Sequence, residues 1–206
     1  MVEIDVTCNL ESFRRFLVNS TCRSFIPESY MRDPEVFPEK EEEPGSIYIG
    51  SARHETAEYF KDREKSASIR RGSLVTLGDV GYFDDDGFLF LCDRKIDMII
   101  SGGVNIYPAE VEACLLAHDA VADVAVIGVP DDDWGESVKA IVEPRAGIDA
   151  GPELADELAE HCRERIARFK CPRSIDFVAV LPRLPNGKIE KRRLREPYWA
   201  GQQRAI

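Results

Sequence analysis

Apolar and polar residues alternate along residues 46–94 in the way that β-strands require. The stretch "SIYIG" alternates residue by residue, and the β-rich runs "SLVTLGDVGYF" and "GFLFLCDR" flank an acidic turn at residues 84–87. Two such runs around an Asp-Gly turn are typical of a β-hairpin. We therefore expect this region to contain a hairpin.

Strands and helices alternate from about Asp97 onward. The run "KIDMIISGGVNIYPAEVEACLLAH" predicts an apolar strand, a Gly-Gly loop and a helix with Pro108 in its first turn, where proline is well tolerated. Glu110 and Glu112 lie near the positive end of that helix dipole. The runs "DVAVIGVP", "VKAIVEP" and "SIDFVAVLP" predict further strands. The run "PELADELAEHCRERIARF" predicts an amphipathic helix whose apolar face repeats every four residues: Leu154, Leu158, Cys162 and Ile166.

The predicted order from residue 97 is β-loop-α-β-β-α-β, which indicates a compact α+β domain preceded by a small β-rich segment. Residues 1–45 differ from both. Their proline-punctuated acidic run "PEVFPEKEEEPG" favours a partly disordered segment, and "LESFRRFLV" before it fits a short amphipathic helix. We expect three parts: an acidic segment (1–45), a β-hairpin region (46–96) and the α+β domain (97–206).

Charge is distributed unevenly along the chain. The formal net charge is −11, yet residues 161–206 carry twelve Lys or Arg residues against four acidic residues. This distribution argues against a general nucleic-acid binder. It fits either a basic end that attracts one compact, highly anionic ligand or a basic tail that is simply solvated, and charge alone does not decide between them.

Composition indicates a cytoplasmic protein. No apolar run approaches the ~20 residues that a membrane-spanning helix needs, and the opening "MVEIDVTCNL" is acidic where a secretory signal is basic. The six cysteines contain no C-x-x-C pair, and there are only three histidines, so neither a disulfide framework nor a structural metal site is expected.

Three segments carry candidate chemistry. Asp79 follows a glycine in a predicted strand, where it can accept hydrogen bonds from the vicinal hydroxyls of a ribose or cap backbone amides; read locally, the second role is the commoner one. Arg94 has a planar donor fork suited to phosphate, and Gly102-Gly103 allows a ligand close to the backbone or serves only as a turn. Lys188 in "LPNGKIEK" can neutralise charge in acyl-phosphate chemistry, although an exposed lysine usually only faces solvent.

Taken in order, with "VPDDDWGESVKAIVEP" and "RFKCPRSIDFVAVLPRLPNGKIEK", these segments resemble the adenylate-forming superfamily, and most closely its fatty-acyl-CoA and aryl-CoA ligases. The resemblance covers about residues 45–197. It implies that residues 46–96 are the end of the large AMP-binding domain and that residues 97–206 form the small C-terminal domain, called the lid. Such enzymes use Mg-ATP to convert a carboxylate to an acyl-adenylate, and CoA then displaces AMP to give a thioester.

The resemblance also implies roles for individual residues. Lys188 matches the catalytic lysine of adenylation, Asp79 matches the acid that holds the ribose hydroxyls, and Arg94 matches an arginine at the ribose and phosphate. Ile96 occupies the hinge position, where the family usually has Asp or Lys, so the usual polar contact cannot form there. The residues that match CoA contacts are Gly102, Gly103, Trp134, Phe169, Lys170 and Arg173.

The Ser/Thr/Gly-rich phosphate loop of the family does not occur in these 206 residues, nor do the adenine-binding segment, the Mg²⁺-coordinating glutamate and the acyl pocket. We therefore expect negligible adenylation by this chain alone. It would be a truncated or split ligase that needs a separate large domain, a binding module for CoA, a nucleotide or a partner protein, or a remnant without present function. Self-association through an exposed strand edge is a further expectation.

Overall fold

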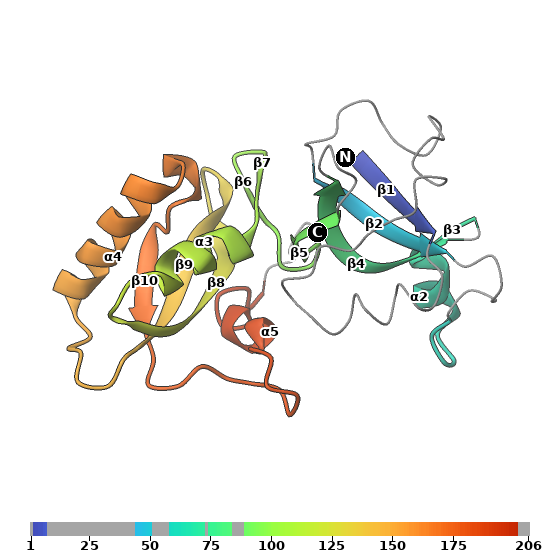
Figure 1. Cartoon of the computed structure of the whole chain (residues 1–206). Coiled ribbons are helices and arrows are strands. Elements are labelled where there is room, and N and C mark those ends of the chain that lie inside the picture. Colours follow the sequence, from blue (N-terminus) through green and yellow to red (C-terminus); the bar gives the residue numbers. More distant parts are fainter. Residues whose placement is uncertain (1, 8–43, 51–57, 73, 84–88, 202–206) are drawn as a thin grey trace. The chain divides into compact units, whose positions relative to one another are not determined.

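The computed structural model describes residues 2–7, 44–50, 58–72, 74–83 and 89–201. The chain divides into two compact units, Met1–Lys95 and Ile96–Ile206. Each unit contains one five-stranded sheet (Figure 1), so the architecture is mixed, with both strands and helices, as predicted. No helix in the described part of the chain is long and apolar enough to cross a membrane.

The first unit is built around strand β4, which pairs with three neighbours. In chain order its elements are β1 (Val2–Thr7), β2 (Gly45–Gly50), α2 (Arg63–Ser68), β3 (Arg70–Arg71), β4 (Leu74–Phe83) and β5 (Leu89–Arg94). β4 and β5 are antiparallel, which confirms the predicted hairpin. β1 runs parallel to β2. The sequence pattern did not predict β1, α2 or β3. The turn at 84–87 and the helix expected from "LESFRRFLV" lie outside the described residues.

The second unit has its sheet in the order β10-β9-β6-β7, with β8 paired to β9. In chain order its elements are β6 (Ile99–Ser101), β7 (Val104–Ile106), α3 (Pro108–Leu116), β8 (Val121–Asp131), β9 (Gly135–Pro144), α4 (Pro152–Arg165), the 3-10 turn η2 (Arg168–Lys170), β10 (Ser174–Phe177) and α5 (Lys191–Arg195). β8 and β9 form a long antiparallel hairpin, and β10 runs parallel to β9.

Most predicted elements of the second unit are confirmed, although two end early. α3 begins at Pro108, as expected. The predicted helix from residue 152 ends at Arg165, because Ile166 adopts an extended conformation and a 3-10 turn follows. The strand expected from "SIDFVAVLP" ends at Phe177. The Gly-Gly loop is the turn of a short hairpin between β6 and β7.

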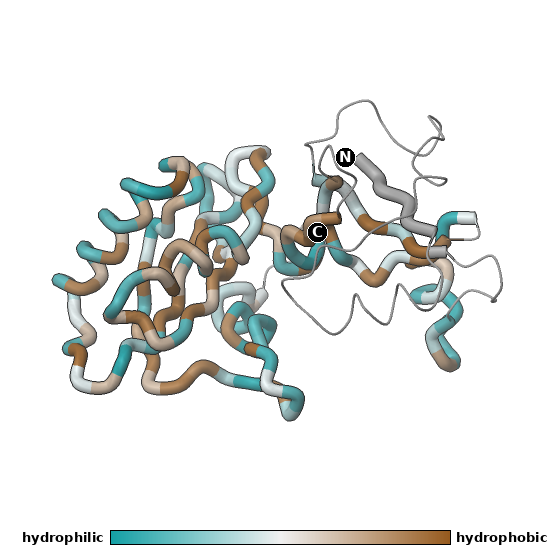
Figure 2. The backbone as a smooth tube through the Cα atoms, viewed as in Figure 1, coloured by the Kyte–Doolittle hydropathy of each residue, from teal (hydrophilic) through white to brown (hydrophobic). Residues whose placement is uncertain are grey.

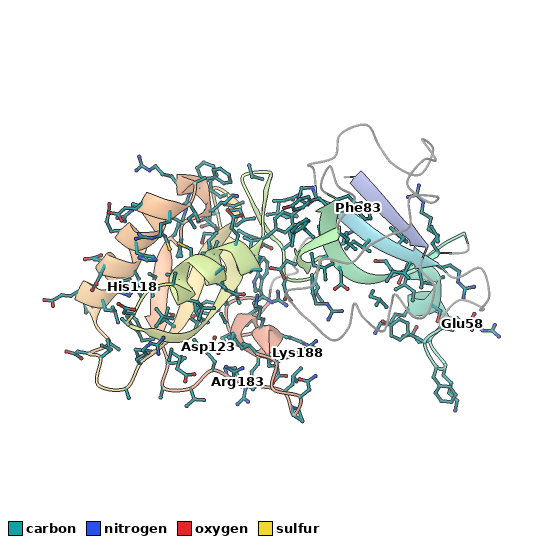
Figure 3. All side chains as sticks on the ribbon, in the orientation of Figure 1. Glu58, Phe83, His118, Asp123, Arg183 and Lys188 are labelled. Carbon is teal, nitrogen blue, oxygen red and sulfur yellow. The ribbon has the colours of Figure 1, made fainter. Side chains whose placement is uncertain are left out.

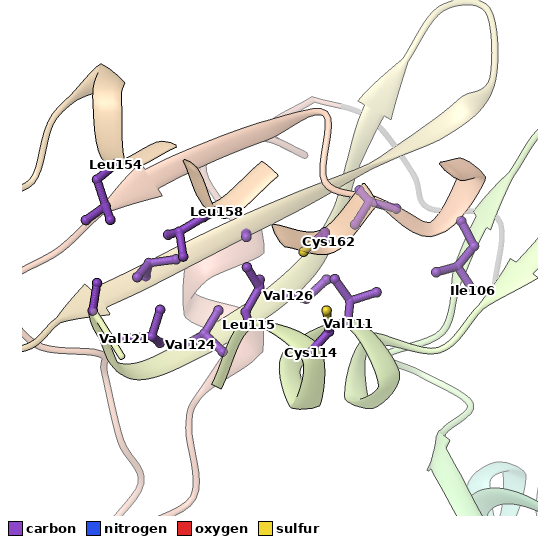
Figure 4. Packing of buried hydrophobic residues seen from close by; sticks show 14 of the residues in the cluster. Ile106, Val111, Cys114, Leu115, Val121, Val124, Val126, Leu154, Leu158 and Cys162 are labelled. Atoms are coloured by element: carbon purple, nitrogen blue, oxygen red, sulfur yellow. The ribbon is translucent and has the colours of Figure 1, made fainter. Parts of the chain in front are cut away.

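Alternate residues of β8 are buried on opposite faces of the sheet. Val124 and Val126 pack with α3 and α4, whereas Ala125 and Ile127 pack with the segment after β10, including Leu181. Side chains of a strand alternate between its two faces, so covering both faces explains the continuous apolar run in this strand. Figure 4 shows the first of these clusters, and Figure 2 shows hydrophobic and hydrophilic positions alternating along α4. Leu154, Leu158 and Cys162 are buried there, as predicted.

A polar network attaches the C-terminal segment to the sheet. The buried Lys139 amine lies 2.8 Å from the Asp176 carboxylate, which also accepts a 2.9 Å hydrogen bond from the Tyr198 hydroxyl. Burial raises the pKa of Asp176, but hydrogen bonds from Lys139 and Tyr198 outweigh it and hold this pKa below its usual value. Burial and the hydrogen bond to Asp176 raise the pKa of Tyr198 to about 12. The indole of Trp199 donates to the Gly128 carbonyl at 2.9 Å and adds a second attachment.

Replacing Tyr198 with Phe tests this network through its pH dependence. Tyr198 ionises at about 12 in the folded chain and near its ordinary pKa of 10.0 when unfolded. A raised folded-state pKa contributes stability that is complete below the unfolded pKa and is lost as pH rises through the folded pKa. We expect the difference in unfolding free energy between the original chain and Tyr198→Phe, measured by urea denaturation, to shrink as pH rises from 10 toward 12. A difference that does not change with pH contradicts the network.

Candidate functional site

Asp79 and Arg94 face each other in the first unit. They are opposite partners in the antiparallel pairing of β4 with β5, and Arg94 Nε lies 3.4 Å from Asp79 Oδ1. The same guanidinium donates to the Leu77 carbonyl at 3.0 Å, so its orientation is fixed from two sides. Both side chains remain partly exposed. The pair presents a carboxylate acceptor next to an oriented cation, an arrangement able to hold adjacent hydroxyls beside a phosphate.

Gly102, Trp134 and Arg173 come together in the second unit. The Gly102 amide donates to the Trp134 carbonyl at 2.9 Å, and the indole packs so closely on Gly102 that an added Cβ would lie 2.5 Å from Trp134 Cε3. The Arg173 guanidinium lies 5.0 Å from the centre of the indole. Asp131 joins them, since its carboxylate accepts from the Trp134 amide and pairs with Arg173 at 3.4 Å. Trp134 is 48% exposed, so this group presents an aromatic surface with a cation to solvent.

Phe169 and Lys170 form a separate group on the 3-10 turn η2. The Lys170 amine binds both carboxylate oxygens of Glu110, each at 2.7 Å, and lies 5.7 Å from the centre of the Phe169 ring. Among the described residues, no hydrogen bond or ion pair joins these two side chains to Trp134 or Arg173. The charge of Lys170 is therefore already paired, while the ring of Phe169 is exposed.

Lys188 lies on a turn whose backbone is held by hydrogen bonds while its side chain is exposed. The Leu184 amide donates to the Lys188 carbonyl at 2.8 Å, and the Gly187 amide donates to the Leu184 carbonyl at 2.8 Å. Asn186 accepts from the Lys188 amide at 3.2 Å, and Gly187 adopts a φ of +84° that favours glycine. The Lys188 amine makes no hydrogen bond or ion pair with any residue that the structure describes.

Ile96 is held through its backbone. Its side chain is 62% exposed, but its carbonyl accepts a 3.0 Å hydrogen bond from Arg195 Nη1. The same Arg195 nitrogen lies 2.8 Å from the Asp97 carboxylate, and Arg195 is buried. The Ile96 side chain offers no polar group, but the hydrogen bond from Arg195 on α5 holds the backbone of Ile96 in place.

Sequence reasoning did not predict three of these partners. Arg195 binds Ile96 across 99 positions of sequence, and Glu110 binds Lys170 across 60. Arg183 contacts the Lys188 turn and Asp123. Of these three contacts, only the one made by Arg183 could have been predicted from the sequence. Arg183 lies in the same short segment as Lys188, and its guanidinium can donate hydrogen bonds to the carbonyls of a turn.

Comparison with known proteins identifies relatives for most of the chain. Residues 110–188 match the family described as AMP-binding enzyme C-terminal domain. A 2-succinylbenzoate–CoA ligase of Geobacillus sp. (strain WCH70) is 39% identical over 154 residues, which are 75% of this chain and 30% of that protein. A long-chain-fatty-acid–CoA ligase of Bacillus subtilis (strain 168) is 43% identical over 154 residues, 75% of this chain and 27% of that protein.

Solved structures agree with these relatives. An o-succinylbenzoate CoA synthetase of Bacillus subtilis, in complex with its acyl-adenylate intermediate, is 35% identical with a TM-score of 0.67 and covers 75% of this chain and 31% of its own. An anthranilate CoA ligase in complex with anthranoyl-AMP is 34% identical with a TM-score of 0.70, covering 81% of this chain and 32% of its own. The chain thus spans about 30% of the length of the relatives that it matches.

The two glycines of the β6–β7 turn provide a matched test of the Trp134 group. Both have positive φ, +58° at Gly102 and +81° at Gly103, but only at Gly102 does an added Cβ meet the indole. Alanine at either position costs on the order of 1 kcal/mol of backbone strain. We expect Gly102→Ala to destabilise the chain further and to change the Trp134 fluorescence, while Gly103→Ala leaves the emission spectrum unchanged. Equal urea denaturation midpoints and equal spectra for the two variants contradict this packing.

Proposed function

Because this chain belongs to the adenylate-forming acyl-CoA ligases, whose C-terminal region it matches, we propose that it supplies the lid for ATP-dependent activation of a carboxylic acid. The overall reaction is carboxylate, ATP and CoA giving acyl-CoA, AMP and pyrophosphate. A large adenylation domain, not contained in these residues, supplies the phosphate loop, the Mg²⁺ site and the acyl pocket. The acid is a fatty or an aromatic acid, since ligases for both are among the relatives.

The Lys188 turn is the observation that carries this proposal. An attacking carboxylate places negative charge on the α-phosphate of ATP, and a cation already in position stabilises that charge without reorganisation. Such a cation needs a fixed backbone and an amine that is free to meet the phosphate. The backbone of Lys188 is fixed by hydrogen bonds, and its amine is not paired with any carboxylate of the described chain.

The remaining candidates fit the two substrates that every such ligase shares. Asp79 and Arg94 together offer acceptors for ribose hydroxyls and a donor fork for phosphate. The exposed Trp134 ring, with the Arg173 guanidinium 5.0 Å from its centre, offers an aromatic surface for the nucleotide part of CoA. Arg173 pairs with Asp131 and Lys170 pairs with Glu110, so neither cation is free of a carboxylate partner.

Lys188→Ala tests the proposal in a reconstituted reaction. The full chain is mixed with the separately expressed large domain of the Bacillus subtilis o-succinylbenzoate CoA synthetase, and ATP–pyrophosphate exchange is measured with o-succinylbenzoate. We expect exchange only when both proteins are present, and a loss on the order of 100-fold for Lys188→Ala, as when one oriented charge-stabilising group is removed. Lys65→Ala, which removes an exposed lysine from α2, serves as the control and retains full exchange. Robust exchange by this chain alone, or a Lys188→Ala reaction as fast as the original, contradicts the proposal.

A second candidate function is a module that binds CoA or a nucleotide without catalysis, and the exposed Trp134–Arg173 group favours it. Calorimetric titration of the isolated chain with CoA and with AMP separates the two. A partner-dependent lid gives no heat with either ligand at micromolar concentration, whereas a binding module gives saturable heat with CoA that Trp134→Ala abolishes. We expect no binding by the isolated chain.

A further inference from the structure

Arg183 bridges the Lys188 turn and strand β8. Its Nη1 donates to the Gly187 carbonyl at 2.8 Å, and its Nη2 forms an ion pair with the Asp123 carboxylate. Figure 3 labels Asp123, Arg183 and Lys188 in the second unit. Gly187 precedes Lys188 directly, so one side chain joins the peptide next to the candidate catalytic lysine to the sheet. The planar guanidinium makes this possible, because its two terminal nitrogens reach two acceptors at once in a fixed geometry.

The other hydrogen bonds of the turn close it upon itself or attach its base, where the Leu181 amide donates to the Glu143 carboxylate at 2.9 Å. Glu190 donates its amide to the Pro182 carbonyl at 2.8 Å, and Arg183 pairs with Ile189 in an isolated β-bridge, so these contacts close the segment upon itself. Leu181 and Ile189 pack on the sheet and hold the base of the turn. At its tip, among the described residues, the Gly187 carbonyl is bound by Arg183 alone.

Asp123 is itself held in place at the other end of the bridge. Its Oδ1 accepts the Val124 amide at 2.8 Å, which leaves Oδ2 for Arg183. The residue lies near the start of β8, between the exposed Ala122 and the buried Val124. The bridge therefore connects the tip of the turn to β8, the strand whose residues 124–129 are buried in the second unit.

We propose that Arg183, anchored by Asp123, is a positioning residue that sets where the Lys188 amine lies during adenylation. This inference rests on the proposed function of Lys188. A flexible lysine side chain is effective only if its backbone is placed correctly, and a displacement of about 1 Å can lower a rate by about 100-fold. The Arg183 bridge restricts movement of the backbone next to Lys188, and it leaves the Lys188 amine unpaired among the described residues.

The alternative is that Arg183 forms an ordinary surface ion pair. Such pairs contribute little to stability, and their loss changes no step of a reaction selectively. The Arg163–Glu160 pair on α4 is a matched control, since both arginines are similarly exposed and each pairs with one carboxylate. Arg163→Gln therefore removes the same charge and the same type of contact at a site away from the Lys188 turn.

Hydrogen exchange of the full chain tests the structural half of the inference without any activity. We expect Arg183→Gln to raise the exchange rate of the Gly187 and Lys188 amides at least tenfold while amides in β8 and β9 keep their protection. Asp123→Asn should give a smaller increase at the same amides, and Arg163→Gln none. Unchanged exchange of the turn in Arg183→Gln overturns the inference and leaves the proposed function of Lys188 intact.

The reconstituted reaction tests the catalytic half. We expect Arg183→Gln to lower the kcat of adenylation about tenfold with little change in KM for ATP, and Arg183→Lys to recover only part of the loss. Thioester formation from supplied o-succinylbenzoyl-adenylate and CoA should remain unchanged, which a loss of folded protein would not allow. Equal losses in both half-reactions, or no loss, overturn the inference. Failure of Lys188→Ala to impair exchange overturns the proposed function instead.

Discussion

The antiparallel pairing of β8 with β9 is the constraint on which the second unit depends. Its register decides that alternate residues of β8 point to α3 and α4 on one face and to the C-terminal segment on the other. A shift of one residue would exchange the two faces and leave neither core packed. The same pairing also places Trp134 at the hairpin turn and Asp123 on the strand. The positions of Trp134 and of Asp123, which anchors the Lys188 turn, are thus consequences of one strand register.

Hydrophobic pattern and turn residues predicted the main strands and the two longer helices, but not β1, α2, β3, β7 or α5. The apolar spacing of Leu154, Leu158 and Cys162 identified the buried face of α4, and the Asp-Gly turn identified the β4–β5 hairpin. The ends of elements were less accessible. Ile166 continues the helical spacing, yet it adopts an extended conformation and packs on the same core from outside the helix. The spacing of apolar residues predicts which residues are buried, but it does not show where the helical backbone ends.

The candidate site was predictable residue by residue only through the family resemblance. Read locally, Asp79 was more naturally a turn carboxylate, because nothing in its neighbourhood shows that Arg94 is its partner across the hairpin. The contacts that hold the candidates in place join residues far apart in the chain, as Arg183 and Asp123 or Arg195 and Ile96 do. Such pairs are set by the packing of whole elements, which one sequence without relatives does not reveal.

The ion pairs also settle what the basic C-terminal end contributes. Most of its described cations are bound to carboxylates of the second unit: Arg163, Arg165, Lys170, Arg173, Arg183, Lys191 and Arg195. The excess positive charge of residues 161–206 is therefore largely neutralised by carboxylates that lie nearby in the folded chain. This weakens the long-range attraction of an anionic ligand. Lys188, like Arg168, Arg192 and Arg193, is not neutralised by a described carboxylate, and it differs from those three in lying at the tip of a hydrogen-bonded turn. Chemistry at a phosphate requires one such cation at a defined place more than it requires a general positive field, and among the paired cations Arg183 is the one that contacts the Lys188 turn.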